Sequence, residues 1–159
     1  MANNEFNVNG EVFEPRTIDA IGKFAILWSK FENDWCGNFC SNNKIKQVAD
    51  SCVSEKWCGF ITEWQEFAAA LKSRAIYCGY EDCEMYVDNM GALEYFGEEP
   101  RSAVKGFLKK QEQGTFAGGL MAIYRIRNNM FHGLKGSLNE QFAFFEAVNK
   151  LLEKIIKKD

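Results

Sequence analysis

The side chains of this sequence with the clearest chemical potential lie in one stretch at positions 125–133, which reads RIRNNMFHG. It contains two arginines, two asparagines and the only histidine of the chain. The apolar spacing around it predicts a helix. At about 100° per residue, Arg125, Asn128, Asn129 and His132 then fall within one sector of roughly 100°.

These residue types suit chemistry on a phosphate. Arginine offers a planar fork to phosphate oxygens, and an imidazole removes or supplies a proton near neutral pH. This set fits RNA cleavage in which the 2′-hydroxyl of the substrate is the nucleophile, so that no serine, cysteine or metal nucleophile is required. The competing interpretation is a solvated polar face, with His132 favoured at a helix C-terminus because its cation suits the helix dipole. Two successive asparagines, which are mediocre helix formers, favour the functional interpretation.

Two sequence patterns resemble those of HEPN domains (higher eukaryotes and prokaryotes nucleotide-binding). Residues 127–132, RNNMFH, resemble the R-x4–6-H motif of that family, including the polar residue that commonly follows the arginine. Residues 28–32, WSKFE, resemble the first-helix W-x-x-F-E pattern of some bacterial members. The resemblance implies a metal-independent endoribonuclease without a cofactor, often a toxin or antiviral effector, that works as a homodimer with its motifs at the interface.

The resemblance also implies roles for individual residues. His132 would be the acid/base residue, Arg127 would stabilise the phosphorane, and Asn128 would position the phosphate or the histidine. On an ideal helix Arg127 lies about 140° from His132, whereas Arg125 lies about 20° from it. We favour Arg127 because Asn128 follows it, and keep Arg125 as its rival because six intervening residues also fit the family. Glu32 could pair with one of these arginines or with His132, although a glutamate on a long helix is more often a surface residue.

A homodimer is also favoured by the chemistry. Cleavage through a 2′,3′-cyclic phosphate needs a base and an acid, but one chain supplies one histidine. A two-fold axis that brings motif against motif would add a second imidazole and concentrate positive charge. The alternative is a non-catalytic HEPN-like module that binds nucleotide, RNA or a partner protein, such as an antitoxin, a defence-system component or a nucleotidyltransferase-like protein.

The elements that must position these residues are predicted to be helices. Apolar residues recur at the i, i+3, i+4, i+7 spacing, only 2 prolines interrupt the chain, and no strand pattern is convincing. The expected helices cover 17–39 with Thr17 as N-cap, 45–49, 54–75, 81–96, 99–114, 115–132 and, after a capping box at 137–140, a last one ending near 157. We therefore expect a single HEPN-like domain over residues 1–159, an all-α, up-and-down bundle of about five to seven helices.

Composition sets the limits of these expectations. A chain of 159 residues with 47% hydrophobic and 14% aromatic residues is not disordered. Its net charge of -3 gives no indication of nucleic-acid binding. Two basic stretches, within 101–110 and 150–158, are most simply solvated faces, and could follow an RNA backbone if they flank the cleft.

The remaining expectations concern location and cysteines. No apolar run approaches the roughly 20 residues of a membrane span, and no secretory signal is visible. We therefore expect a cytoplasmic protein without membrane contact. The six cysteines lack zinc-like spacing and are expected to be free thiols that act as small apolar residues, at Cys36, Cys40, Cys52, Cys58, Cys78 and Cys83.

Overall fold

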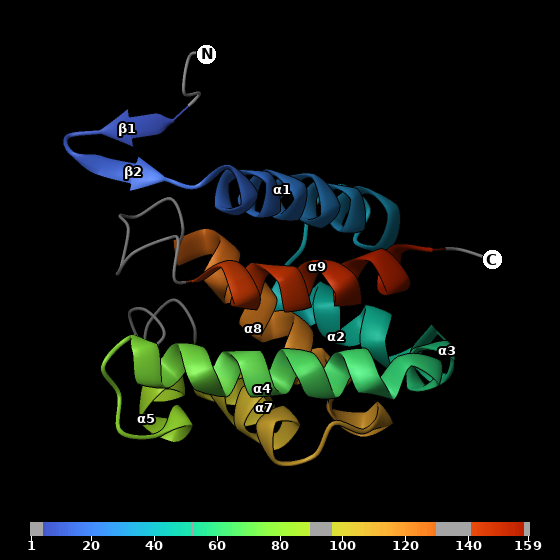
Figure 1. The fold of residues 1–159 in the computed structure, drawn as a ribbon. Helices are drawn as coiled ribbons and strands as arrows, with labels where there is room; N and C mark the ends of the chain where they lie inside the picture. Colours follow the sequence, from blue (N-terminus) through green and yellow to red (C-terminus); the bar gives the residue numbers. More distant parts are fainter. Residues whose placement is uncertain (1–4, 52, 90–96, 130–140, 158–159) are drawn as a thin grey trace.

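The computed structural model describes residues 5–51, 53–89, 97–129 and 141–157. These residues form an all-α bundle, which confirms the predicted fold class (Figure 1). The long helices are α1 (Pro15–Trp35), α4 (Ile61–Tyr77), α7 (Glu98–Lys109), α8 (Phe116–Asn129) and α9 (Phe142–Ile156). Shorter elements connect them: α2 (Asn42–Asp50), α3 (Val53–Trp57), α5 (Cys83–Asp88) and 3-10 turns at Cys58–Phe60 and Gln113–Thr115.

The last helix lies between the first and the fourth. Helix α9 packs against both α1 and α4, while α8 packs against α7 and α2. Figure 1 shows α1 and α9 side by side and running in the same direction, with α4 running the opposite way below them. The main neighbour of α1 is thus the helix most distant from it in the sequence.

Aromatic side chains fill the contact between α4, α7 and α8. The ring of Trp64 stacks on that of Phe116, with centroids 4.3 Å apart and planes 8° from parallel. Phe107 meets Trp64 edge-on at 5.7 Å. All three side chains are fully buried, so the predicted apolar stripes do form the core.

Two successive glycines bring α8 unusually close to α7. A Cβ at Gly118 would overlap the backbone carbonyl group of Ala103 on α7. A Cβ at Gly119 would lie 2.9 Å from the ring of Trp64 and 3.1 Å from that of Phe107. Only a residue without a side chain fits at these positions, and this contact therefore fixes where α8 lies.

Several predicted helix boundaries were wrong by a few residues. Helix α1 begins at Pro15, with Glu14 rather than Thr17 as N-cap, because the fixed φ of proline and its missing N–H suit a first helical position. Thr17 is instead buried in the first turn. The helix also ends at Trp35, before residue 39.

The helix predicted for 99–114 spans Glu98–Lys109. The chain then turns through a capping box between Glu112 and Thr115 before α8 begins. Of the helix predicted for 81–96, the structure shows α5, and residues 90–96 lie outside the described residues. The capping box predicted at 137–140 lies outside them too.

An antiparallel hairpin precedes the bundle and was not predicted. Strand β1 (Phe6–Val8) pairs with β2 (Glu11–Phe13), with Phe6 opposite Phe13. The two-residue loop is Asn9-Gly10, with φ of 53° and 85°. Both loop residues have positive φ, as the turn of a two-residue hairpin requires.

The expectation of six free thiols was wrong for one pair. Cys36 and Cys40 form a disulfide, and both are buried. The chain reverses through Gly37 and Asn38, whose φ values are 68° and 84°, which brings the two Cα atoms within 5.2 Å. Of the other described cysteines, Cys58, Cys78 and Cys83 are not disulfide-bonded, and Cys52 lies outside the described residues. In the described part of the chain, no helix has both the length and the apolar character to cross a membrane.

Candidate active site

The last two turns of α8 carry the predicted arginines. Arg125, Arg127 and Asn128 are half-buried, while Ile126 between them is buried in the core. Because Ile126 faces the core, the three polar side chains lie at the edge of the packed region. His132 lies outside the described residues.

Arg127 and Asn128 contact each other. The Nη1 group of Arg127 donates a hydrogen bond to Oδ1 of Asn128 at 3.1 Å. The resemblance gave Asn128 a positioning role towards phosphate or histidine. The described geometry shows its carbonyl oxygen holding the neighbouring guanidinium.

Arg125 lies in a less polar environment. Burial lowers the pKa of its guanidinium, while the neighbouring Tyr124 raises it. Because the ordinary pKa of arginine is far above neutrality, Arg125 keeps its charge near pH 7. Burial therefore gives this site a cation with incomplete hydration, which strengthens its attraction for anions.

The first-helix pattern contacts the motif helix through its aromatic residues. Trp28 and Phe31 are buried, with ring centroids 5.1 Å apart. The ring of Trp28 also stacks on Tyr124 of α8 at 6.0 Å. The first-helix pattern thus contacts α8 at Tyr124, three residues before the start of the 127–132 motif, and α1 supports this part of α8.

Glu32 caps the end of α1. Its Oε2 accepts a hydrogen bond from the backbone N–H of Cys40 at 3.2 Å. Its backbone carbonyl accepts from the N–H groups of Cys36 and Asn38. These contacts hold the loop after α1, and the pairing of Glu32 with an arginine or with His132 stays a prediction.

A polar cluster that was not predicted lies where α4 and α5 meet the start of α9. Nε of Arg74 donates to the hydroxyl of Tyr86 at 3.0 Å, and its Nη1 donates to Oε1 of Gln141. The guanidinium carbon lies 5.0 Å from the ring centroid of Phe144. The four residues span 70 positions of sequence, so no local pattern could have grouped them.

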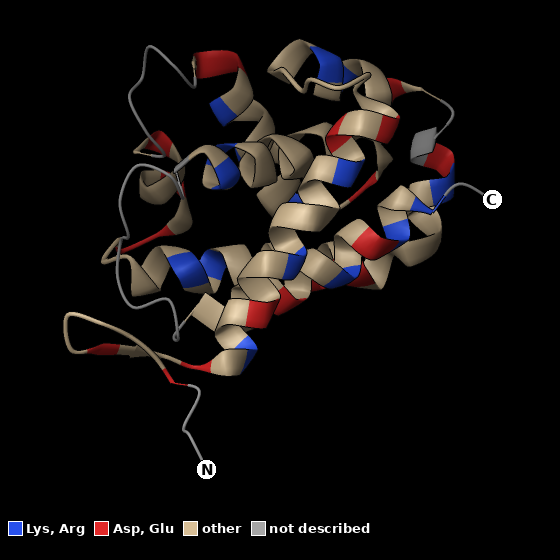
Figure 2. Cartoon of the chain, turned by 90° about the horizontal axis from the view of Figure 1, so that it is seen from above, with Lys and Arg blue, Asp and Glu red and all other residues tan. Residues whose placement is uncertain are grey.

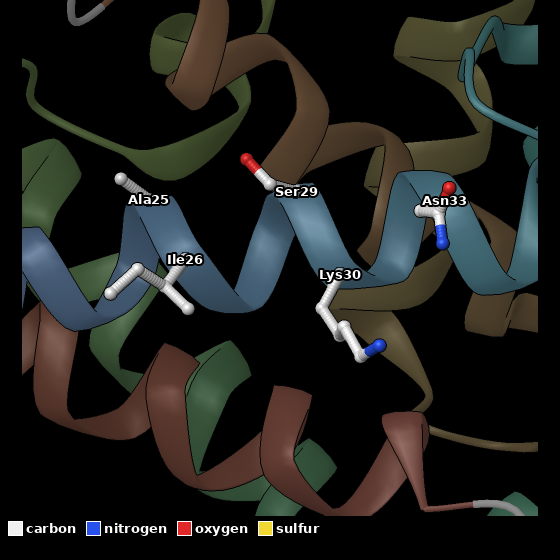
Figure 3. A pocket seen from close by; sticks show the side chains of 5 residues that line it. All are labelled: Ala25, Ile26, Ser29, Lys30 and Asn33. Carbon is white, nitrogen blue, oxygen red and sulfur yellow. The ribbon is translucent and has the colours of Figure 1, made fainter.

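None of the predicted site residues lines either of two surface hollows that lie among the described residues. Figure 3 shows one along the outer face of α1, where Ala25 and Ser29 point to one side and Ile26 and Lys30 towards α9. The second lies between α1 and α9, and is lined by Arg16, Asp19, Ala20, Lys23, Phe142, Glu146, Asn149, Lys150 and Glu153. The charges of the second hollow are mixed in sign.

Charge is interspersed over the described surface. Figure 2 shows Lys and Arg alternating with Asp and Glu along the helices. Lys105, in the basic stretch 101–110, forms a salt bridge with Asp88 at 2.7 Å. Among the residues described, no three His, Cys, Asp or Glu side chains lie close enough together to hold a metal ion.

The chain was also compared with known proteins. No protein-family model matches it, and neither a curated protein nor a solved structure gives a match.

Proposed function

We propose that this chain is a metal-independent endoribonuclease of the HEPN type that acts on RNA. The observation that carries the proposal is the end of α8, where Arg125, Arg127 and Asn128 form a half-buried cationic turn shortly before His132 in the sequence. The stacking of Trp28 on Tyr124 supports it, since this contact packs the first-helix pattern against the helix that carries the motif.

In the proposed reaction the 2′-hydroxyl of a nucleotide attacks the adjacent phosphate. His132 takes the proton of that hydroxyl or supplies one to the leaving 5′-oxygen. Arg127 stabilises the negative charge of the phosphorane, and Asn128 holds the guanidinium of Arg127 in place. Arg125 is the alternative candidate for the role of Arg127 in stabilising the phosphorane.

The active form is proposed to be a homodimer with the two motifs facing each other, since one chain supplies one imidazole. The biological role is that of a cytoplasmic toxin or antiviral effector, with an antitoxin or a defence-system protein as partner. Light scattering should show twice the chain mass at micromolar concentration. A strict monomer that still cuts RNA would contradict the composite site.

The central experiment is cleavage of total RNA by the purified protein in EDTA. Products should carry 2′,3′-cyclic phosphate and 5′-hydroxyl ends. General acid–base assistance is worth about 10²–10⁴-fold, so His132→Ala should slow cleavage by that order without loss of helix. A requirement for Mg²⁺, or 5′-phosphate ends, would indicate metal-assisted hydrolysis instead.

The non-catalytic alternative has its own signature in the same experiment. A binding module would bind RNA or nucleotide in EDTA but leave RNA intact, and His132→Ala would not alter the products. A normal thermal unfolding midpoint for His132→Ala is the control for both outcomes.

A further inference from the structure

Among the residues that the structure describes, Arg74 is a cation whose guanidinium contacts only neutral side chains. It lies in the last turn of α4 and is half-buried. The residues that contact its guanidinium are neutral and more than nine-tenths buried: Tyr86 is 8% exposed, Gln141 4% and Phe144 5%. Among the residues that the structure describes, no carboxylate forms an ion pair with it.

Such a cation is costly to keep. A charge removed from water is normally paired with an opposite charge, because neutral hydrogen-bond partners replace only part of the lost hydration. The C-terminal dipole of α4 adds about half an elementary charge of compensation. Helix α5 brings carboxylates to the same end of the bundle, at its N-cap Asp82 and at Glu84, but among the described residues neither forms an ion pair with Arg74.

Among the residues that the structure describes, only part of the donor capacity of Arg74 is used. A guanidinium has five N–H donors, and the contacts with Tyr86 and Gln141 use two of them. These contacts and the Phe144 ring fix the plane of the group. A fixed planar fork with spare donors is suited to two neighbouring oxygens of one phosphate group.

Arg16 also contacts an aromatic ring of α9, but it has a carboxylate partner. Its guanidinium lies 4.5 Å from the ring centroid of Phe142, which precedes by two residues the Phe144 ring that Arg74 contacts. Arg16 pairs with Glu14 at 2.8 Å, and its side chain is 63% exposed. Cation–aromatic contact with α9 therefore does not by itself exclude a carboxylate partner.

We infer that Arg74 is an anion-binding group that takes a phosphate, held in place for that purpose by Tyr86 and Gln141. Figure 1 places the end of α4, α5 and the start of α9 at one end of the bundle. Helix α9 adds no acidic residue in its first turn. The phosphate belongs to an RNA backbone or to a small phosphate compound, and the RNA source rests on the proposed function.

The test for RNA uses binding rather than cleavage, so that it is independent of catalysis. Fluorescence anisotropy with an uncleavable 2′-O-methyl RNA is measured at several salt concentrations. Arg74→Gln should weaken binding about tenfold, as for one lost charge-assisted hydrogen bond, and flatten the salt dependence by about 0.7 in log K against log salt. The matched control Arg16→Gln should keep both values.

Arg74→Lys keeps the charge but loses the planar fork. It should retain the salt dependence and bind RNA several-fold more weakly. This variant also decides the matter if Arg74→Gln does not fold. Arg74→Lys with wild-type affinity, or Arg16→Gln with an equal loss, would overturn the RNA assignment.

The second arm identifies a small phosphate. Inorganic phosphate at constant ionic strength should raise the unfolding midpoint of the wild type, but not that of Arg74→Gln or Arg74→Lys, if a small compound is the ligand. A protein that binds RNA through Arg74 without cutting it would refute the proposed catalysis and leave this inference standing. If neither RNA nor phosphate responds to Arg74, the inference is wrong and the residue only ties α4 and α5 to α9.

Discussion

Two regions of this molecule hold their helices together in opposite ways. Between α7 and α8, Gly118 and Gly119 let backbone and aromatic rings meet without polar side chains. At the end of the bundle, α4, α5 and α9 meet around the guanidinium of Arg74, and its hydrogen bonds and ring contact join them. Steric fit determines how the helices meet in the first region. The charge and hydrogen bonds of Arg74 do so in the second.

The difference shows where function is to be sought. A close-packed contact maximises stability, and every side chain there is explained by its neighbours. A half-buried cation with neutral partners lowers stability unless something else uses it. Arg74 of α4 belongs to this second kind, since its described partners are the neutral residues Tyr86, Gln141 and Phe144.

The largest expected effect comes from adding one methyl group to the contact between α7 and α8. Gly118→Ala would force α8 away from the backbone of Ala103, and should lower the free energy of unfolding by about 3 kcal/mol or more, at the upper end of overpacking effects. Urea unfolding measures this. Gly22→Ala is the matched control, because a Cβ there meets nothing within 4 Å, and should raise stability by about 0.5–1 kcal/mol. Equal effects at both positions would mean that the α7–α8 contact is not tightly packed.

A smaller effect is expected from the arginines at the end of α8. Arg127→Lys keeps the charge but loses the planar grip on phosphate, and should slow RNA cleavage about tenfold or more. Arg125→Lys should have the lesser effect, and unfolding of both variants should match the wild type within about 0.5 kcal/mol. The reverse order would assign the catalytic role to Arg125.

The smallest effect concerns the partner of Arg74. Burial raises the pKa of Tyr86 above its usual value of 10.0, and the charge and hydrogen bond of Arg74 oppose that shift. The fold therefore favours the protonated phenol. Its contribution to stability is complete below about pH 10 and is lost as the pH rises through the raised pKa. Urea unfolding from about pH 9 to 11 should show a shallower alkaline loss for Tyr86→Phe than for the wild type; identical profiles would contradict the shift.

Helical periodicity was enough to predict the fold class. Apolar residues spaced at 3.6 on α1 and α9 did become buried stripes, including Phe24 and Phe145, whose rings meet at 5.5 Å. The hairpin was missed although Asn9-Gly10 is a strong two-residue turn signal, because strands of three residues are too short to show alternation. The placement of α9 between α1 and α4 depends on contacts distant in sequence, which periodicity does not encode.

The candidate site was predictable only in part. Sequence spacing placed Arg125, Arg127 and Asn128 on one late helix, and the structure shows all three there. It could not show that Glu32 turns to the Cys40 amide, since that depends on how the loop after α1 folds back. Nor could it group Arg74 with Tyr86 and Gln141, which only the tertiary fold brings together.

Two kinds of interaction close the loop that follows α1. One is the disulfide between Cys36 and Cys40, and the other is the set of hydrogen bonds that Glu32 accepts. In the chain-entropy model, a cross-link between Cys36 and Cys40 stabilises the fold by about 2 kcal/mol, because the ring is so small. The hydrogen bonds that Glu32 accepts from the N–H groups of Cys40 and Asn38 involve no sulfur atom. We therefore expect a reducing environment to remove a modest increment of stability while these hydrogen bonds keep the turn closed.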